Sequence, residues 1–166
     1  MARLHLLLAL PSILAPLGCS SFGVTTSEMP AVAPFTASET GDAKVCVFRS
    51  GIPAPLFTTT VRDNGALVGA TKDRTYFCYL AEPGVHRIVS DGTYGETEAT
   101  FEAAPGRRYY VRQSWLFPAP RGHELSFLDE SFAREEMAGD DYSRLVEVPA
   151  GSAVPDARPF APAARR

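Results

Sequence analysis

The cysteines of this chain carry its most distinctive chemistry. Cys46 and Cys78 each lie in the middle of a short run of apolar, β-favouring residues. In an oxidising compartment two such thiols form a disulfide. Closing a loop of about 33 residues would stabilise the fold by roughly 3–4 kcal/mol on the chain-entropy view. Two buried cysteines acting as small hydrophobic side chains explain the same positions equally well, so the sequence leaves both interpretations open.

Histidine could supply acid–base chemistry or a metal ligand, and His86 and His123 are the candidates. Neither has another histidine or a cysteine at the spacing of a zinc site. Ser114 or Ser126 could act as a nucleophile only beside a histidine and an acid, and neither lies in a nucleophile-elbow glycine pattern. We therefore expect turn and surface histidines, no catalytic residue, no metal and no cofactor. A histidine that met a carboxylate or hydroxyl in a polar cleft would favour an enzyme instead.

The segment from Trp115 to Gly122 is the strongest candidate for a binding surface. It holds the only tryptophan and continues through Phe117 and a Pro-rich stretch to Arg121. At a loop tip, Trp115, Phe117 and Arg121 would form an aromatic patch suited to a glycan, a protein or a lipid interface. Alternatively Trp115 packs in the core, which is common in β-sandwiches and is the interpretation we favour.

The charge pattern excludes one class of partner. The net charge is −3, Lys44 and Lys72 are the only lysines, and the arginines are scattered. No basic stripe suits a phosphate backbone, so we expect no nucleic-acid partner. Acidic residues gather between Asp129 and Asp141, but without the spacing of a calcium loop, which favours a solvated helix face.

The N-terminus has the pattern of an export signal. Arg3 precedes an apolar stretch that ends at Leu17, too short to span a bilayer but typical of a signal peptide over residues 1–18. The following Gly18-Cys19-Ser20 resembles the lipobox of bacterial lipoproteins, which implies cleavage before Cys19 and a lipid on its thiol. Ser20 is similar to outer-membrane sorting signals, which favours the outer membrane over the inner one. An ordinary signal peptide with an incidental cysteine is the alternative.

Composition divides the rest of the chain into three parts. Residues 19–42 are rich in Ser, Thr, Pro, Ala and Gly, which predicts a flexible tether. Residues 149–166 are rich in Ala and Pro, which predicts a disordered tail. The folded unit is expected over residues 43–148, a common domain size.

Within that unit the apolar pattern has period two, and turn residues interrupt it. Asn64-Gly65 between two β-rich runs is a strong hairpin signal, because both residues tolerate the positive φ of a type I′ turn. Further turns are expected at Pro83-Gly84, Asp91-Gly92 and Pro105-Gly106, and a short helix at Asp129–Met137. The pattern predicts an all-β fold: a small antiparallel β-sandwich of about seven or eight strands with one short C-terminal helix.

Several short motifs occur together in order. They are Val45-Cys46-Val47-Phe48-Arg49, Asp63-Asn64-Gly65, Tyr76-Phe77-Cys78-Tyr79-Leu80, Pro83-Gly84-Val85-His86 and Gly106-Arg107-Arg108-Tyr109-Tyr110-Val111. From Ala43 to about Met137 the chain resembles a bacterial family of exported lipoproteins, domain of unknown function twenty-eight forty-six. The resemblance implies an Ig-like or prealbumin-like sandwich, close in style to PEGA modules, and implies no activity.

Together these patterns predict a lipid-anchored protein of the bacterial cell envelope, with its domain in the periplasm or at the cell surface. Its sandwich would be a non-catalytic binding or structural module. The expected partners are a membrane, through the lipid on Cys19, and an envelope protein or glycan. A subunit of an envelope complex and an envelope hydrolase are the alternatives.

Overall fold

A computed structural model describes the chain over residues 23–27, 41–50, 58–92, 95–115 and 123–147. Within these residues the elements are, in chain order, β1 (Gly23–Ser27), β2 (Ala43–Arg49), β3 (Thr59–Asp63), β4 (Ala66–Thr71), β5 (Thr75–Ala81), β6 (Gly84–Gly92), β7 (Gly95–Ala103), β8 (Arg108–Trp115), β9 (His123–Leu128), α1 (Glu130–Glu136) and β10 (Asp141–Glu147). No helix in these ranges is both long and apolar enough to cross a bilayer.

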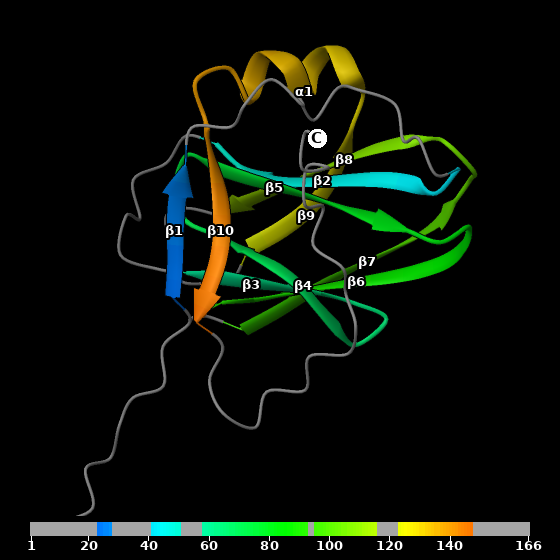
Figure 1. Ribbon diagram of the computed structural model, residues 1–166, viewed down its shortest axis with the longest axis horizontal. Helices are drawn as coiled ribbons and strands as arrows, with labels where there is room; N and C mark the ends of the chain where they lie inside the picture. Colours follow the sequence, from blue (N-terminus) through cyan, green and yellow to red (C-terminus); the bar gives the residue numbers. More distant parts are fainter. Residues whose placement is uncertain (1–22, 28–40, 51–57, 93–94, 116–122, 148–166) are drawn as a thin grey trace, which may run out of the picture.

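The strands form two sheets that pack face to face (Figure 1). One sheet has the order β1-β10-β5-β2-β8-β9 and the other the order β4-β3-β6-β7. This confirms the expected all-β sandwich with one short helix. The larger sheet is mixed, however, because β2 pairs in parallel with β8 and β10 in parallel with β5. All the other neighbouring strands pair in the expected antiparallel direction.

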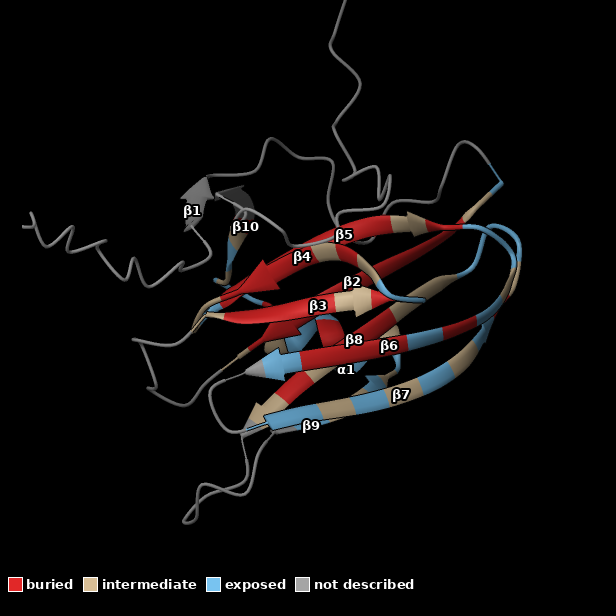
Figure 2. Ribbon diagram, turned by 90° about the horizontal axis from the view of Figure 1, so that it is seen from below, coloured by how far each residue is buried: buried red, intermediate tan, exposed pale blue. Residues whose placement is uncertain are grey.

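Alternate residues of the strands meet between the sheets and form the main core. Its buried members are Ala43, Val45, Val47, Val61, Phe77, Tyr79, Ala81, Ile88, Ala103 and Val111. In β7 the expected alternation is present: Thr97, Ala99 and Phe101 are half-buried, while the residues between them are exposed. Figure 2 shows the result, with β2, β3 and β5 buried along most of their length and β7 largely exposed.

A second, smaller core lies on the opposite face of the larger sheet, beneath α1 (Figure 1). It unites Cys46, Phe48, Tyr76, Cys78 and Tyr110 from the sheet with Ala133 and Met137 from the helical region. Ion pairs join Arg108 to Glu130 at 2.8 Å and Arg112 to Glu136 at 2.6 Å, and so fasten α1 to β8. A helix of seven residues depends on this packing, because so short a segment is only marginally stable alone.

Of two turns predicted from the sequence, the structure confirms one and contradicts the other. Asn64 and Gly65 have φ values of 48° and 85° and close the β3–β4 hairpin, which confirms the type I′ signal. The turn predicted at Asp91-Gly92 is wrong, because β6 continues through both residues, which pair with Glu96 and Gly95 of β7. The strand therefore extends two residues beyond Ser90, where it was expected to end.

The structure also has more strands than the sequence predicts: ten within the described residues, where seven or eight were expected. One of them, β1, lies inside the segment 19–42 that composition assigns to a flexible tether. Its backbone pairs with five residues of β10, so main-chain hydrogen bonding orders it without the apolar periodicity on which the prediction relied. Residues 19–22 and 28–40 of that segment, and the tail 149–166, lie outside the described residues.

Candidate functional site

A buried cluster of His86, Asp63 and Tyr79 has the composition of a catalytic site. Asp63 Oδ2 lies 2.7 Å from His86 Nδ1 and accepts a hydrogen bond of 2.9 Å from the Tyr79 hydroxyl. His86 Nε2 lies 2.7 Å from the backbone carbonyl oxygen of Glu82. Asp63 Oδ1 is buried with no hydrogen-bond partner among the described atoms.

Strand alternation brings the three side chains together. Asp63 ends β3 on the same face as Val61, which is wholly buried in the main core. Tyr79 lies on the inward face of β5, and His86 is the third residue of β6, on the inward face that Ile88 continues. Because β3 and β6 are neighbours in the smaller sheet and β5 belongs to the larger one, the cluster ties the two sheets together.

The hydrogen bonds leave the imidazole no free nitrogen. A carbonyl oxygen can only accept, so Nε2 carries a hydrogen and donates it to Glu82. Nδ1 faces the Asp63 carboxylate, so both ring nitrogens are engaged within the protein. Burial, with the nearby Asp63 charge, raises the pKa of Tyr79 well above its usual value, which keeps its hydroxyl a donor. This arrangement suits an internal fastening better than proton transfer to a substrate.

The low solvent exposure of the cluster also favours a structural role. His86, Asp63 and Tyr79 are only 9%, 5% and 3% exposed. The His86 ring also packs on Phe101, with ring centroids 5.4 Å apart, and Phe101 contacts Tyr109 and Phe127. His86 therefore meets a carboxylate that also accepts from a tyrosine hydroxyl, but it does so within the packed interior. The expectation of a surface histidine is wrong for His86.

A second group of polar side chains bridges the sheets farther along the interior. The Gln113 amide of β8 donates to Ser90 Oγ of β6 at 2.6 Å, and its carbonyl accepts from Thr71 of β4. Arg49, only 1% exposed, donates to Thr59 Oγ1 at 3.3 Å. Burial lowers the pKa of Arg49, while the charge of Asp73 acts in the opposite direction. These bonds satisfy polar groups that the sandwich buries between its layers.

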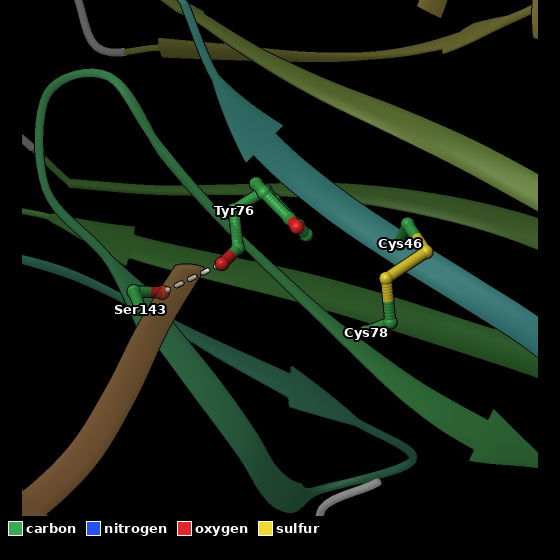
Figure 3. Close-up of a disulfide and its surroundings, with 4 residues drawn as sticks. All are labelled: Cys46, Tyr76, Cys78 and Ser143. Carbon is green, nitrogen blue, oxygen red and sulfur yellow. Dashed lines mark hydrogen bonds between the residues drawn. A yellow bond between two sulfur atoms is a disulfide. The ribbon is translucent and has the colours of Figure 1, made fainter. Parts of the chain in front are cut away.

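Cys46 and Cys78 form a disulfide (Figure 3). They are directly opposed in the antiparallel β2–β5 pair, with Cα atoms 4.0 Å apart. Both side chains belong to the smaller core under α1, so the bridge lies on the outer face of the larger sheet, shielded from solvent. The structure thus contains the first of the two arrangements that the sequence left open.

The other predicted site residues are only partly placed. Cys19, Phe117 and Arg121 lie outside the described residues. Trp115 is the last residue of β8, where its backbone pairs with His123 of β9, and its side chain is outside the described set. The structure therefore places the backbone of one residue of the proposed aromatic patch at a strand end, and the patch stays a prediction.

The acidic residues near the C-terminal helix separate into different local contacts. Glu130 pairs with Arg108 and Arg134, and its pKa is lowered chiefly by the hydrogen bond from Arg134. Asp140 instead accepts a 2.7 Å hydrogen bond from Ser50, while burial raises its pKa. Within the described part of the chain, no group of three His, Cys, Asp or Glu side chains is placed to hold a metal.

Sequence reasoning missed the partners of His86. The available signal was Asp63 itself, an acidic residue in phase with the apolar positions of its strand, where a buried polar partner is required. Tyr79 gave no such signal, because a tyrosine in an apolar run suits a core without a specific role. No family model matches the chain, and the search of curated proteins finds no match.

Proposed function

We propose that this chain is an exported lipoprotein of the bacterial envelope, anchored by a lipid on Cys19, with a sandwich that acts as a non-catalytic binding or structural module. The observation that supports export best is the Cys46–Cys78 disulfide. Bacterial disulfides persist mainly outside the reducing cytoplasm, so a bridge buried in the core fits a chain that folds after export. The lipobox-like Gly18-Cys19-Ser20 supports the anchor independently.

The buried cluster supports a non-catalytic module. Both nitrogens of His86 are occupied by Asp63 and Glu82, and the cluster has little exposure to solvent. General acid–base catalysis needs a group that can reach a substrate proton. An envelope protein or a glycan is the expected partner, and the outer membrane the expected location, because Ser20 follows the cysteine.

Metabolic labelling tests the anchor. Cells that express the full chain are grown with a radioactive fatty acid, and the immunopurified protein is checked for label. We expect label in the wild type and none in Cys19→Ala. The double variant Cys46→Ala/Cys78→Ala is the matched control, because it also loses cysteines yet should keep its label. Unlabelled wild type, or label that survives Cys19→Ala, would refute the proposal.

A further inference from the structure

The N-terminal strand is part of the folded body. Gly23, Val24, Thr25, Thr26 and Ser27 of β1 pair in antiparallel register with β10, from Gly23 opposite Glu147 to Ser27 opposite Tyr142. A paired strand has fixed length and direction, unlike the flexible chain that composition suggests for this region. The folded body therefore includes Gly23–Ser27.

The sandwich holds β10 in turn. Tyr142 pairs in parallel with Tyr76 of β5, and the two rings meet edge to face at 5.7 Å. Ser143 is buried, and its hydroxyl lies 2.8 Å from the carbonyl oxygen of Ala70 in β4 and 3.2 Å from that of Tyr76 (Figure 3). The backbone N–H of Asp141 also donates to the carbonyl of Arg74 at 3.0 Å. Strand β10 thus connects β1 to both sheets, through β5 in the larger one and β4 in the smaller one.

The covalent path from Cys19 to this body is very short. Four Cα–Cα steps separate Cys19 from Gly23, which limits their separation to about 14 Å even when fully extended. Resting on the proposed lipid at Cys19, we propose that the sandwich is held against the lipid surface in a preferred orientation. The Gly23–Glu147 end of the β1–β10 ladder faces the lipid.

The ladder also fixes which part of the molecule points outward. Helix α1 ends at Glu136, just before β10 begins at Asp141, so α1 lies at the Ser27–Tyr142 end of the ladder. Figure 1 shows β1 starting at the end of the ladder farther from α1. The seven residues of β10 span about 20 Å, so α1 stands well above the surface that the Gly23 end approaches.

Fluorescence resonance energy transfer from a dye on the protein to dyes on the lipid headgroups tests this orientation. The dyes are attached in separate variants at Glu147→Cys and at Ser131→Cys, an exposed position on α1. Lipid on Cys19 and the Cys46–Cys78 bridge leave each introduced thiol as the reactive one. The full-length lipoprotein is reconstituted in phosphatidylcholine vesicles with a short-range dye pair. We expect transfer from position 147 to be several-fold more efficient than from position 131.

A flexible insert supplies the matched comparison. A 20-residue Gly/Ser segment between Phe22 and Gly23 adds a coil of about 25 Å root-mean-square length, which should bring the two efficiencies close together. The same segment appended after Arg166 should leave their ratio unchanged. Equal transfer from the two positions in labelled, uninterrupted protein would overturn the orientation and leave the anchor standing. Absence of fatty-acid label in the same sample would overturn the anchor and the orientation together.

Discussion

His86 Nδ1 and Asp63 Oδ2 lie 2.7 Å apart inside the sandwich, and Tyr79 donates to the same carboxylate oxygen. His86 and Asp63 come from β6 and β3 of the smaller sheet, and Tyr79 comes from β5 of the larger one. Each member compensates a polar group of another that would otherwise be buried without a partner. The cluster therefore acts as a fastening between the layers, and its loss should be felt in stability.

Removing the carboxylate should be strongly destabilising. Asp63→Ala leaves His86 and Tyr79 buried without their acceptor, and we expect the free energy of unfolding to fall by about 2–4 kcal/mol. Tyr79→Phe removes one donor and should cost about 1–2 kcal/mol. Urea unfolding at pH 7 measures both. Asp91→Ala makes the same change at an exposed site and should stay within about 0.5 kcal/mol of wild type. An Asp63→Ala effect no larger than this control would contradict the fastening role.

The stability of the fold should respond to the charge of Asp140. Burial raises the pKa of this carboxyl above 3.8, so the folded state favours its neutral form. The stabilisation that the neutral carboxyl gives the folded state is fully present below pH 3.8. It is lost as the pH rises through the pKa of Asp140 in the folded state. Asp140→Asn keeps an acceptor for Ser50 without the charge. The free energy of unfolding of the variant should therefore be higher than that of wild type at pH 7. The difference should stay below about 1 kcal/mol, because Asp140 is partly solvated.

Thermal unfolding across the acid range measures this difference. The advantage of Asp140→Asn should shrink as the pH falls and disappear below pH 3.8, where the carboxyl is neutral in both states. A variant less stable than wild type at pH 7 would show instead that the Ser50 hydrogen bond depends on the carboxylate.

The disulfide should contribute a large part of the stability. Cys46 and Cys78 are 32 positions apart, and losing this cross-link should lower the free energy of unfolding by about 3–4 kcal/mol. Urea unfolding of Cys46→Ala/Cys78→Ala measures the loss. A reductant should lower the free energy of unfolding of the wild type and leave that of the double variant unchanged. Two titratable thiols in denatured, unreduced protein from the envelope fraction would contradict the bridge.

The sequence predicts those features that local chemistry decides. Asn64-Gly65 specifies its hairpin because few residues tolerate two successive positive φ values. The alternation of β7 specifies a strand with one buried face. The fold class follows from many such signals repeated at short intervals.

Features that depend on register could not be predicted in this way. Cys46 and Cys78 both occupy strand centres, but only the pairing of β2 with β5 makes them direct opposites. The partners of His86 likewise depend on three strands from two sheets. Strand β1 was missed for a related reason: its order comes from the backbone of β10, which its own composition does not reveal.

Gly69 in β4 lies where the two sheets pack closely together. Replacing it with alanine should change the free energy of unfolding in the opposite direction to the usual one. A Cβ atom at Gly69 would lie 2.5–2.8 Å from ring carbons of Phe77, a buried core residue. Replacing glycine by alanine within a strand is ordinarily stabilising. Here Gly69→Ala should instead lower the free energy of unfolding by about 1–3 kcal/mol, because the ring must shift in a packed core. Adding Phe77→Leu should relieve the clash, so urea unfolding should give a double-variant cost below the sum of the single costs. Strict additivity would mean that the cost of Gly69→Ala does not arise from its contact with the Phe77 ring.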